Sequence, residues 1–364
     1  MKPTVLFPAS YYDISTIEPS FKDEYKAALQ SHLFNISFFN FDSFVEGNPL
    51  KIYNEGNNNS NPCRVVYRGW MMKPEQYKRF SKELEQGGAK LLSSIDSYKI
   101  MHCYSKAFLR LHDRCINSKI RIFDTDFPVE ACVINEAFDS FLLKDDVKSA
   151  KNTTLPLRVN TPINQAQLDN LISEFKKHRG EQLTGNLIFK QFFELKQYNN
   201  NKTNEWRVFY LNGEVMRAFR NSGQVGSSPA PPQDLIEEFK VGMDAIYYTV
   251  DFAELADGTW MLLETGDGQV SGLATYDSFN EYYNDFGMRL ANISDTDWGH
   301  PDWWDFMDQF ENAAAECGGY VQHPNEMEDM MEKYCIKKIG KLSKRLGLPP
   351  NEELSEEQLK TCLK

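Results

Sequence analysis

The chain has 364 residues, 41% of them hydrophobic and 25% charged, which is enough apolar surface for a sizeable core and a length typical of two to three domains. Its formal net charge of −12 excludes a broad nucleic-acid-binding surface. No apolar run approaches the roughly 18 residues of a membrane span, so we expect neither a nucleic-acid nor a membrane partner.

The N-terminal part alternates between strand and helix patterns. The predicted elements, in chain order, are 4–7 (strand), 21–29 (helix), 36–39 (strand), 64–68 (strand) and 74–85 (helix). Pro74 is typical of a helix start, and Gly87-Gly88 of a helix end. Such alternation favours a small parallel sheet, so residues 1–110 are expected to form an α/β domain.

The middle part is richer in strands, and the last part is helical. Strands are predicted at 141–144 and 187–193, on either side of a helix at 165–177. Two β-hairpins follow, with turns at Asn212-Gly213 and Asp257-Gly258. Residues 291–364 are expected to form a helical C-terminal extension, and the following patterns support it: the apolar stripe Trp303, Phe306 and Phe310, and the capping box of Ser355 with Gln358.

The second hairpin is predicted to place two carboxylates opposite each other. With a two-residue turn at 257–258, Asp251 faces Glu264 directly. Facing carboxylates repel, and a hard cation such as Mg²⁺ between them removes the repulsion. Asp267 follows closely enough to be a further ligand. On the spacing alone, acids that simply point into solvent are an equal alternative.

The first hairpin is predicted to gather charged side chains of both signs. With its turn at 212–213, Glu205 faces Arg220, and Arg207 shares their face. Clusters of this kind are usually surface ion pairs and less often phosphate sites, in which the planar guanidinium group suits the oxygens. The spacing alone favours the ion pair.

Two lysines stand near the ends of apolar strands. They are Lys144 and Lys190, and Lys148 follows in the charged run 144–151. Charged runs are normally solvated, but an ammonium group at the end of a buried strand needs a partner. A phosphate group would serve as that partner.

This order of strand lysine, helix, strand lysine, Glu-x-Arg hairpin and Asp/Glu hairpin resembles the ATP-grasp superfamily. The likeness is closest to a little-characterised bacterial and phage ATP-grasp clade with a YRGWM-like element, here Tyr67–Met71, and an ETGDGQVSGL-like element, here Glu264–Leu273. It runs from about residue 3 to residue 285. The resemblance implies an α+β ATP-grasp fold, in which two α+β subdomains enclose a nucleotide cleft. It places the domain at 111–290, with a lid at about 135–200 and a core at about 201–290.

The resemblance also implies roles for individual residues. Lys144 and Lys190 would contact the phosphates and the adenine side of ATP. Phe193 and Glu194 would belong to the linker against adenine and ribose. The remaining implied roles are Glu205 and Arg207 deeper in the cleft, Arg220 at the γ-phosphate and the transferred group, and Asp251 with Glu264 as the Mg²⁺ ligands.

The chain departs from the superfamily pattern at two places. The superfamily usually has Asn two residues after the metal-binding glutamate, where this chain has Gly266, so we predict Asp267 as the third ligand. No glycine-rich phosphate loop follows Lys144, and we expect Ser149 and backbone N–H groups to replace it.

Most ATP-grasp enzymes phosphorylate a carboxylate to an acylphosphate, which an amine or a thiol then attacks. The resemblance therefore implies an ATP- and Mg²⁺-dependent ligase that acts on a small-molecule or peptide carboxylate. Arg220, Arg68 and Lys148 are the candidate catalytic residues, and the two arginines would hold the acceptor carboxylate. The alternative for Arg68 is a structural role that packs the N-terminal domain against the cleft.

A second function remains open. Some relatives of this fold are nucleotide-binding assembly chaperones, in which ATP is a structural ligand. The acidic composition and the C-terminal extension would suit a protein partner. Product formation separates the two functions, because a ligase makes ADP when an acceptor is present and a chaperone retains ATP.

Other functional classes have little support. His102-Cys103 with His112 and Cys115 matches no familiar zinc spacing, and free thiols are commoner. GxxxxGK and GxSxG motifs are absent, which excludes P-loop enzymes and gives a hydrolase triad no support. The seven cysteines include no CxxC pair, and the first residues have no signal-peptide pattern, so a cytoplasmic location is expected.

Overall fold

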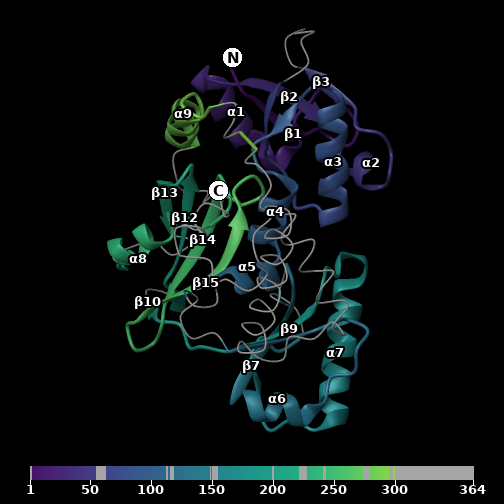
Figure 1. Ribbon diagram of the computed structural model, residues 1–364, viewed down its shortest axis with the longest axis vertical. Coiled ribbons are helices and arrows are strands. Elements are labelled where there is room, and N and C mark those ends of the chain that lie inside the picture. The colour runs from purple at the N-terminus through teal and green to yellow at the C-terminus, as the bar shows by residue number, and fades with distance from the viewer. Residues whose placement is uncertain are drawn as a thin grey trace, which may run out of the picture. The chain divides into compact units, whose positions relative to one another are not determined.

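The computed structural model describes residues 2–54, 63–111, 114, 119–147, 149, 155–198, 201–220, 228–240, 243–273, 279–294 and 298–299. Contacts between Cα atoms divide the chain into two units, Met1–Trp304 and Asp305–Lys364. All described residues belong to the first unit, which is drawn as a ribbon in Figure 1. The predicted helical extension, with its stripe and capping box, lies outside the described residues.

The N-terminal sheet has the strand order β3-β2-β1-β4-β5. Its strands are β1 (Thr4–Pro8), β2 (Asn35–Phe39), β3 (Ile52–Asn54), β4 (Arg64–Tyr67) and β5 (Lys90–Leu91). All neighbours run parallel except β3, which pairs antiparallel to β2 at one edge. The predicted parallel sheet is therefore present, and its central strand β1 is buried along its whole length because helices cover both faces.

Helices cover the N-terminal sheet on its two faces (Figure 1). They are η1 (Pro19–Phe21), α1 (Lys22–Ser31), α2 (Phe41–Val45), α3 (Pro74–Gln86) and α9 (Phe279–Leu290). The next helix, α4 (Ile95–His102), runs below the sheet and contacts α3. α1 and α9 pack together over one face, and α2 and α3 lie on the other. As predicted, α3 begins at Pro74 and ends at Gly87, with Gly88 at φ +82°.

A second sheet, here called the lid sheet, has the strand order β6-β9-β7-β8. Its elements are β6 (Ile120–Phe123), β7 (Ser140–Asp145), β8 (Val159–Asn160), β9 (Leu187–Gln191), α5 (Tyr104–Leu111), α6 (Ala131–Ala137), α7 (Gln165–Arg179) and η3 (Gly180–Gln182). The predicted helix and its two flanking strands are α7, β7 and β9. Asn164 caps α7 by accepting from the N–H of Gln167 at 2.9 Å, and Gln167 Oε1 accepts from the N–H of Asn164 at 3.1 Å.

A third sheet, here called the core sheet, has the strand order β13-β12-β14-β15. Its elements are β12 (Glu205–Leu211), β13 (Glu214–Arg220), β14 (Tyr247–Glu254), β15 (Trp260–Asp267) and α8 (Gln233–Glu238), with the small ribbon β10 (Gln197–Tyr198) and β11 (Lys202–Thr203) beside it. Both predicted hairpins are present. Every residue of β14 is buried, as expected of a central strand.

The register predicted for the first hairpin is wrong by one residue. Arg220 pairs with Trp206 rather than with Glu205, because a β-bulge between Phe209 and Tyr210 shifts the ladder. Directly opposed residues share a face of a sheet. Arg220 and Glu205 therefore lie on opposite faces.

The pairing predicted for the second hairpin is confirmed, for a reason that the sequence did not show. Asp251 lies opposite Glu264. The turn is wider than predicted, since the N–H of Leu255 donates to the carbonyl of Thr259 at 2.7 Å. An irregularity in β15 adds one residue, Leu263, and this addition restores the predicted register. The wider turn and the extra residue shift the register in opposite directions, so Asp251 and Glu264 still face each other.

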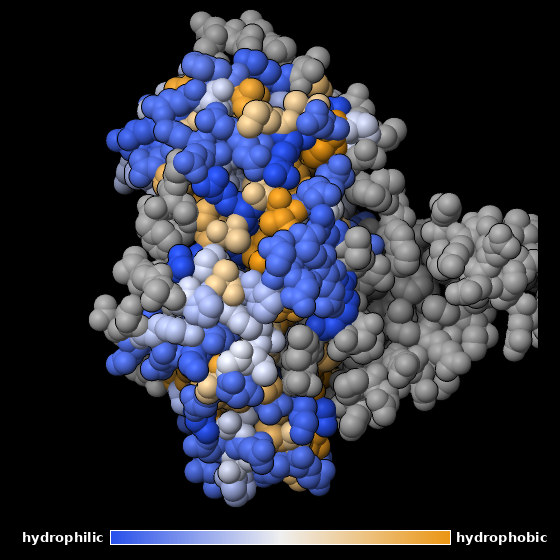
Figure 2. All heavy atoms as spheres, turned by 90° about the vertical axis from the view of Figure 1, so that its left-hand side faces the viewer, coloured by the Kyte–Doolittle hydropathy of each residue, from blue (hydrophilic) through white to orange (hydrophobic). Residues whose placement is uncertain are grey.

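The face of the molecule that carries α9, β13 and α8 is mostly hydrophilic (Figure 2). Apolar side chains appear there in small patches. In the part of the chain that the structure describes, no helix is both long and apolar enough to cross a bilayer.

Candidate functional site

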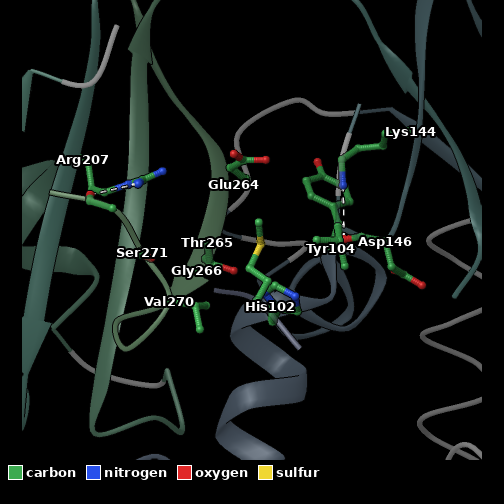
Figure 3. Close-up of a pocket in the computed structure, with 13 residues that line it drawn as sticks. His102, Tyr104, Lys144, Asp146, Arg207, Glu264, Thr265, Gly266, Val270 and Ser271 are labelled. Carbon is green, nitrogen blue, oxygen red and sulfur yellow. Dashed lines mark hydrogen bonds between the residues drawn. The ribbon is translucent and has the colours of Figure 1, made fainter. Parts of the chain in front are cut away.

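A cavity of about 120 Å³ lies between the lid sheet and the core sheet (Figure 3). The side chains with ionisable or aromatic groups that line it come from three regions: Lys144 and Asp146 from the lid, His102 and Tyr104 from α4 and α5, and Arg207 and Glu264 from the core sheet. In the close-up, Glu264 projects from β15 into the space between Arg207 and Lys144. Three of the predicted site residues thus share one cavity.

Lys144 and Lys190 extend from the same face of the lid sheet. Leu142 pairs with Lys190 across β7 and β9, and Lys144 lies two residues further along β7. Both lysines are buried, with exposed fractions of 4% and 6%. Lys144 Nζ donates to the carbonyl of Asp145 at 2.8 Å, and Lys190 Nζ donates to the carbonyl of Leu263 at 2.6 Å. The irregularity in β15 therefore also supplies a partner for a lid lysine.

The environment of Lys144 disfavours its charged form. Burial lowers the pKa of Lys144, although the carboxylate of Glu264 opposes the shift. Lys144 Nζ also lies 4.5 Å from the centroid of the Tyr104 ring, a cation–π contact. An anionic ligand at this position would stabilise the ammonium form.

Arg207 and Asp251 form a two-pronged ion pair beside the cavity. Arg207 Nε lies 2.8 Å from Asp251 Oδ1, and Nη2 lies 2.7 Å from Oδ2. The pKa of Asp251 is raised by burial, and the carboxylates of Glu264 and Glu205 raise it further, whereas Arg207 opposes the shift. The strand pairing thus concentrates negative charge around one guanidinium group.

The donor chemistry at this point fits a hard divalent cation. Three carboxylates, those of Glu205, Asp251 and Glu264, come together here, and Arg207 and Lys144 are among the cations that interact with them. Mg²⁺ prefers oxygen ligands, and it commonly takes one or two protein carboxylates together with phosphate oxygens and water. Within the described ranges, no group of three or more His, Cys, Asp and Glu side chains is arranged to hold a metal. Asp251 and Glu264 are therefore the candidate protein ligands.

Asp267 does not join this pair. It pairs with Tyr248 in the ladder, and strand alternation places it on the face opposite to Asp251 and Glu264. Its side chain is fully buried, and Oδ1 accepts from the N–H of Gln269 at 2.9 Å. Burial raises the pKa of Asp267 to about 6. The predicted third-ligand role therefore has no support from the geometry.

The packing around Gly266 leaves no room for the asparagine that the superfamily usually has at this position. A Cβ atom at this position would lie 2.7 Å from the hydroxyl oxygens of both Thr249 and Ser271. These hydroxyl groups lie 2.9 Å apart and are hydrogen-bonded to each other. The two short polar side chains thus occupy the space that a longer side chain at 266 would need.

Arg220 points away from the cavity-lining Arg207. Its guanidinium group lies 4.6 Å from the centroid of the Trp206 ring, and Nη2 donates to the carbonyl of Ser228 at 3.1 Å. Arg220 does not line the described cavity, and the role at the γ-phosphate that the resemblance implies remains a prediction. Glu205 is on the face of Asp251 but does not line the described cavity.

The linker residues connect the lid sheet to the core sheet. The carbonyl of Glu194 accepts from the N–H of Ala256 at 2.9 Å, and the side chain of Glu194 forms an ion pair with Arg158. Phe193 and Glu194 do not line the described cavity, and their adenine and ribose contacts remain predictions. Lys148 lies outside the described residues, whereas Ser149 forms a β-bridge with Lys144.

Arg68 lies in the interior and connects the two elements that carried the family resemblance. Its guanidinium group pairs with Glu24 at 2.9 and 3.0 Å, and Nη1 donates to the carbonyls of Gly268, Gln269 and Ser271 at 2.6, 3.1 and 3.0 Å. It is 1% exposed. This arrangement supports the structural alternative, because Arg68 clamps the loop after β15 to the N-terminal domain.

Sequence reasoning missed three of the ionisable and aromatic side chains that line the cavity. His102 ends α4 and stacks on Tyr98 at 4.8 Å between ring centroids, and Tyr104 begins α5. Asp146 belongs to the charged run 144–151, in which the sequence does not distinguish it from solvated neighbours. The N-cap residue Ser94 and the acidic residue Asp96 in the first turn are the local signals for the start of α4. His112 and Cys115 of the weighed zinc alternative lie outside the described residues.

Comparison with solved structures identifies the fold. D-alanine–D-alanine ligase from Bacillus anthracis aligns with a TM-score of 0.52 and 9% identity over 80% of this chain and 96% of that chain. D-alanyl-alanine synthetase A from Vibrio cholerae aligns with 0.51 and 13% over 80% and 99%. A RimK domain ATP-grasp protein from Sphaerobacter thermophilus aligns with 0.51 and 11% over 79% and 100%. At these identities the likeness establishes the fold, which is the ATP-grasp fold with mixed α+β structure.

The comparison with family models covers a shorter part of the chain and agrees with the fold comparison. Residues 135–285 match the family model of the ATP-grasp domain, R2K clade family 3. The predicted ATP-grasp resemblance and fold class are confirmed. The Tyr67–Met71 element lies outside the matched residues. No curated protein matches the sequence.

Proposed function

We propose that this protein is an ATP- and Mg²⁺-dependent ligase that joins a carboxylate to an amine or a thiol. The observation that carries the proposal is the single cavity lined by Lys144, Arg207 and Glu264, with Asp251 directly opposite Glu264. Basic groups for phosphates on one wall and an acidic pair for a divalent cation on the other are what phosphoryl transfer from ATP requires.

The residues in the cavity and around it have separate tasks in this proposal. Lys144 and Lys190 bind phosphate oxygens, which replace the backbone carbonyls that their ammonium groups contact now. Asp251 and Glu264 would hold Mg²⁺, which neutralises phosphate charge when bound. Arg207 fixes the orientation of the Asp251 carboxylate through its two hydrogen bonds. Phe193 and Glu194 of the linker lie against adenine and ribose.

The proposed reaction has two steps. A carboxylate oxygen of the acceptor attacks the γ-phosphorus, the bond to the β,γ-bridging oxygen breaks, and ADP leaves with an acylphosphate formed. The amine nitrogen or thiol sulfur then attacks the acyl carbon, the bond from that carbon to the phosphate oxygen breaks, and inorganic phosphate and one proton are released. Neither step needs a side-chain nucleophile, so the protein contributes positioning and charge neutralisation.

The structural neighbours named as D-alanine–D-alanine ligase and D-alanyl-alanine synthetase support the reaction class. The acceptor in this proposal is a small-molecule or peptide carboxylate. The neighbours carry no information on which carboxylate this chain takes, because their identities are 9% and 13%.

ADP release tests the proposal. Mixtures of candidate carboxylates and amines are incubated with protein, ATP and Mg²⁺, and acceptor-dependent ADP is measured. We expect formation by the wild type, loss in Glu264→Gln, and normal formation in Glu214→Gln. Glu214 is a matched control, since it lies on the same sheet in an exposed ion pair with Lys240.

The absence of acceptor-dependent ADP would favour the chaperone function over the ligase function. Tight ATP binding without ADP formation across the acceptor mixtures would contradict the ligase proposal. It would support the non-catalytic ATP-binding chaperone, in which the nucleotide is retained.

A further inference from the structure

Tyr104, the first residue of α5, contacts both of the lysines that the proposed function assigns to the phosphates of ATP. The Nζ atoms of Lys144 and Lys190 lie 4.5 Å and 4.6 Å from the centroid of its ring. The Tyr104 side chain lines the cavity and is 7% exposed. One aromatic ring therefore connects two ammonium groups from neighbouring strands.

Hydrogen bonds to Asp146 fix the position of this ring. The N–H of Tyr104 donates to the carbonyl of Asp146 at 2.7 Å, and the N–H of Ser105 donates to Oδ1 at 2.8 Å. Oδ2 of the same carboxylate accepts from the N–H of Asn186 at 2.8 Å. Asp146 directly follows β7 and Asn186 directly precedes β9. The helix start is thus attached to the two strands that carry the lysines.

Gly185 makes this attachment possible. Its φ of +65° lies in the left-handed region, and a Cβ atom there would lie 2.0 Å from Asp146 Oδ2. A side chain at 185 would displace the carboxylate that holds the start of α5. The glycine before β9 therefore leaves space for the Asp146 carboxylate.

The ring reduces the repulsion between the ammonium groups of Lys144 and Lys190. Two buried ammonium groups on one ring repel each other more strongly than they would in water. The negative face of an aromatic ring attracts each of them and offsets part of that repulsion. The ring is not one of the carbonyl acceptors, so its contact does not have to break when phosphate oxygens replace the carbonyls of Asp145, Asp146 and Leu263.

We infer that Tyr104 is a positioning residue, whose ring holds Lys144 and Lys190 as a pair so that both ammonium groups meet the same polyphosphate. The inference rests on the proposed function. Tyr104 acts through the lysines, so its effect falls on the phosphates of the nucleotide and not on the base.

Calorimetric titration with two ligands tests this inference. Mg²⁺–ATP and adenosine are titrated into the wild type, Tyr104→Leu, Tyr104→Phe and Phe108→Leu. We expect Tyr104→Leu to weaken Mg²⁺–ATP binding about tenfold and to leave adenosine binding unchanged, since the cation–π contacts are lost. Tyr104→Phe keeps the aromatic face and should bind as the wild type does. Phe108, whose ring centroid lies 6.5 Å from that of Tyr104 on the same helix, is the control for lost aromatic packing.

Three results would overturn the inference. Wild-type affinity of Tyr104→Leu for Mg²⁺–ATP would show that the ring does not position the lysines, while the proposed function would stand. Equal weakening of ATP and adenosine in Tyr104→Leu and Phe108→Leu would show a packing role. A wild type that binds no Mg²⁺–ATP would overturn the proposed function and the inference together.

A second measurement does not depend on the leucine variant. Tyr104→Met keeps volume without an aromatic face and replaces Tyr104→Leu if that variant does not fold. In a background with Lys144→Met and Lys190→Met, the methionine substitution should have no further effect on Mg²⁺–ATP affinity. A full additive loss in that background would contradict an action through the lysines.

Discussion

Two arginine–carboxylate pairs in this molecule look alike at close range and differ in their surroundings. Arg68 and Glu24 meet at 2.9 and 3.0 Å, and Arg207 and Asp251 meet at 2.8 and 2.7 Å. Arg68 also donates to three backbone carbonyls and is almost fully buried. The Arg207 side chain is 19% exposed, lines a cavity and has Glu264 as a further acidic neighbour.

The difference separates a structural pair from the pair that we propose to act in ligand binding. In the first pair the guanidinium donors are matched by acceptors from α1 and from the loop after β15, so the pair fastens two parts of the fold. In the second pair, Arg207 lines a cavity together with Glu264, a further carboxylate that interacts with it. A buried charge pair therefore points to a function only when it also borders a cavity that a ligand can enter.

Replacing Arg68 is expected to have the largest effect on stability. Arg68→Met leaves Glu24 buried without its partner and should lower the free energy of unfolding by about 3–5 kcal/mol. Chemical denaturation measures the loss. The double variant Arg68→Met/Glu24→Gln should recover part of it, because no uncompensated buried charge remains. A loss below about 1 kcal/mol in the single variant, typical of exposed pairs, would contradict the clamp.

Replacing Asp267 tests a buried carboxyl group that directly precedes the loop held by Arg68. Its pKa of about 6 lies above the ordinary 3.8, so between these values the native state binds more protons and stability falls as pH rises. Above pH 6 the buried charge costs up to about 3 kcal/mol. Asp267→Asn should raise the melting temperature at pH 7.5 and flatten its dependence between pH 4 and 6. Loss of Mg²⁺-dependent ATP binding in this variant would instead restore Asp267 as a metal ligand.

Replacing Arg207 should destabilise the protein less and in a way that metal reverses. Arg207→Met removes two charge-assisted hydrogen bonds and should cost about 2 kcal/mol in the absence of divalent cations. Because a cation at Asp251 and Glu264 compensates the lost positive charge, Mg²⁺ should raise the melting temperature of this variant more than that of the wild type. Arg68→Met should show no such rescue. Equal responses of the two variants to Mg²⁺ would erase the distinction between the pairs.

The smallest stability effect is expected at Glu264. Glu264→Gln removes repulsion from Asp251 across the ladder but also attraction to Lys144 and Arg207, so the free energy of unfolding should change by less than about 1 kcal/mol. Thermal denaturation without ligand checks this. A clear destabilisation would mean that Glu264 supports the fold instead of a ligand.

Local patterns were sufficient where the chain makes neighbouring contacts. Pro74 and Gly87 bound α3 as predicted, because caps and glycine preferences are local properties. The presence of both hairpins followed from Asn212-Gly213 and Asp257-Gly258. The cluster around Lys144, Glu264 and Asp251 could be anticipated from strand spacing and the family resemblance.

Long-range geometry could not be anticipated. One bulge turned Arg220 to the other face, and another irregularity cancelled a wider turn so that Asp251 still meets Glu264. Neither deviation has a sequence signal as clear as a turn dipeptide. The burial of Arg68 against the loop after β15 depends on contacts about 200 residues apart, and the approach of Tyr104 to both lysines depends on the docking of α5 against the lid sheet.

Thermal stabilisation by ATP, with and without Mg²⁺, tests the central claim most directly. A ligand that binds the folded state raises the melting temperature by mass action. The account predicts a shift with ATP that Mg²⁺ enhances in the wild type and in Glu214→Gln, and that Glu264→Gln loses. An Mg²⁺-enhanced shift of wild-type size in Glu264→Gln, or no shift in the wild type, would contradict the assignment of this cavity as a Mg²⁺–nucleotide site.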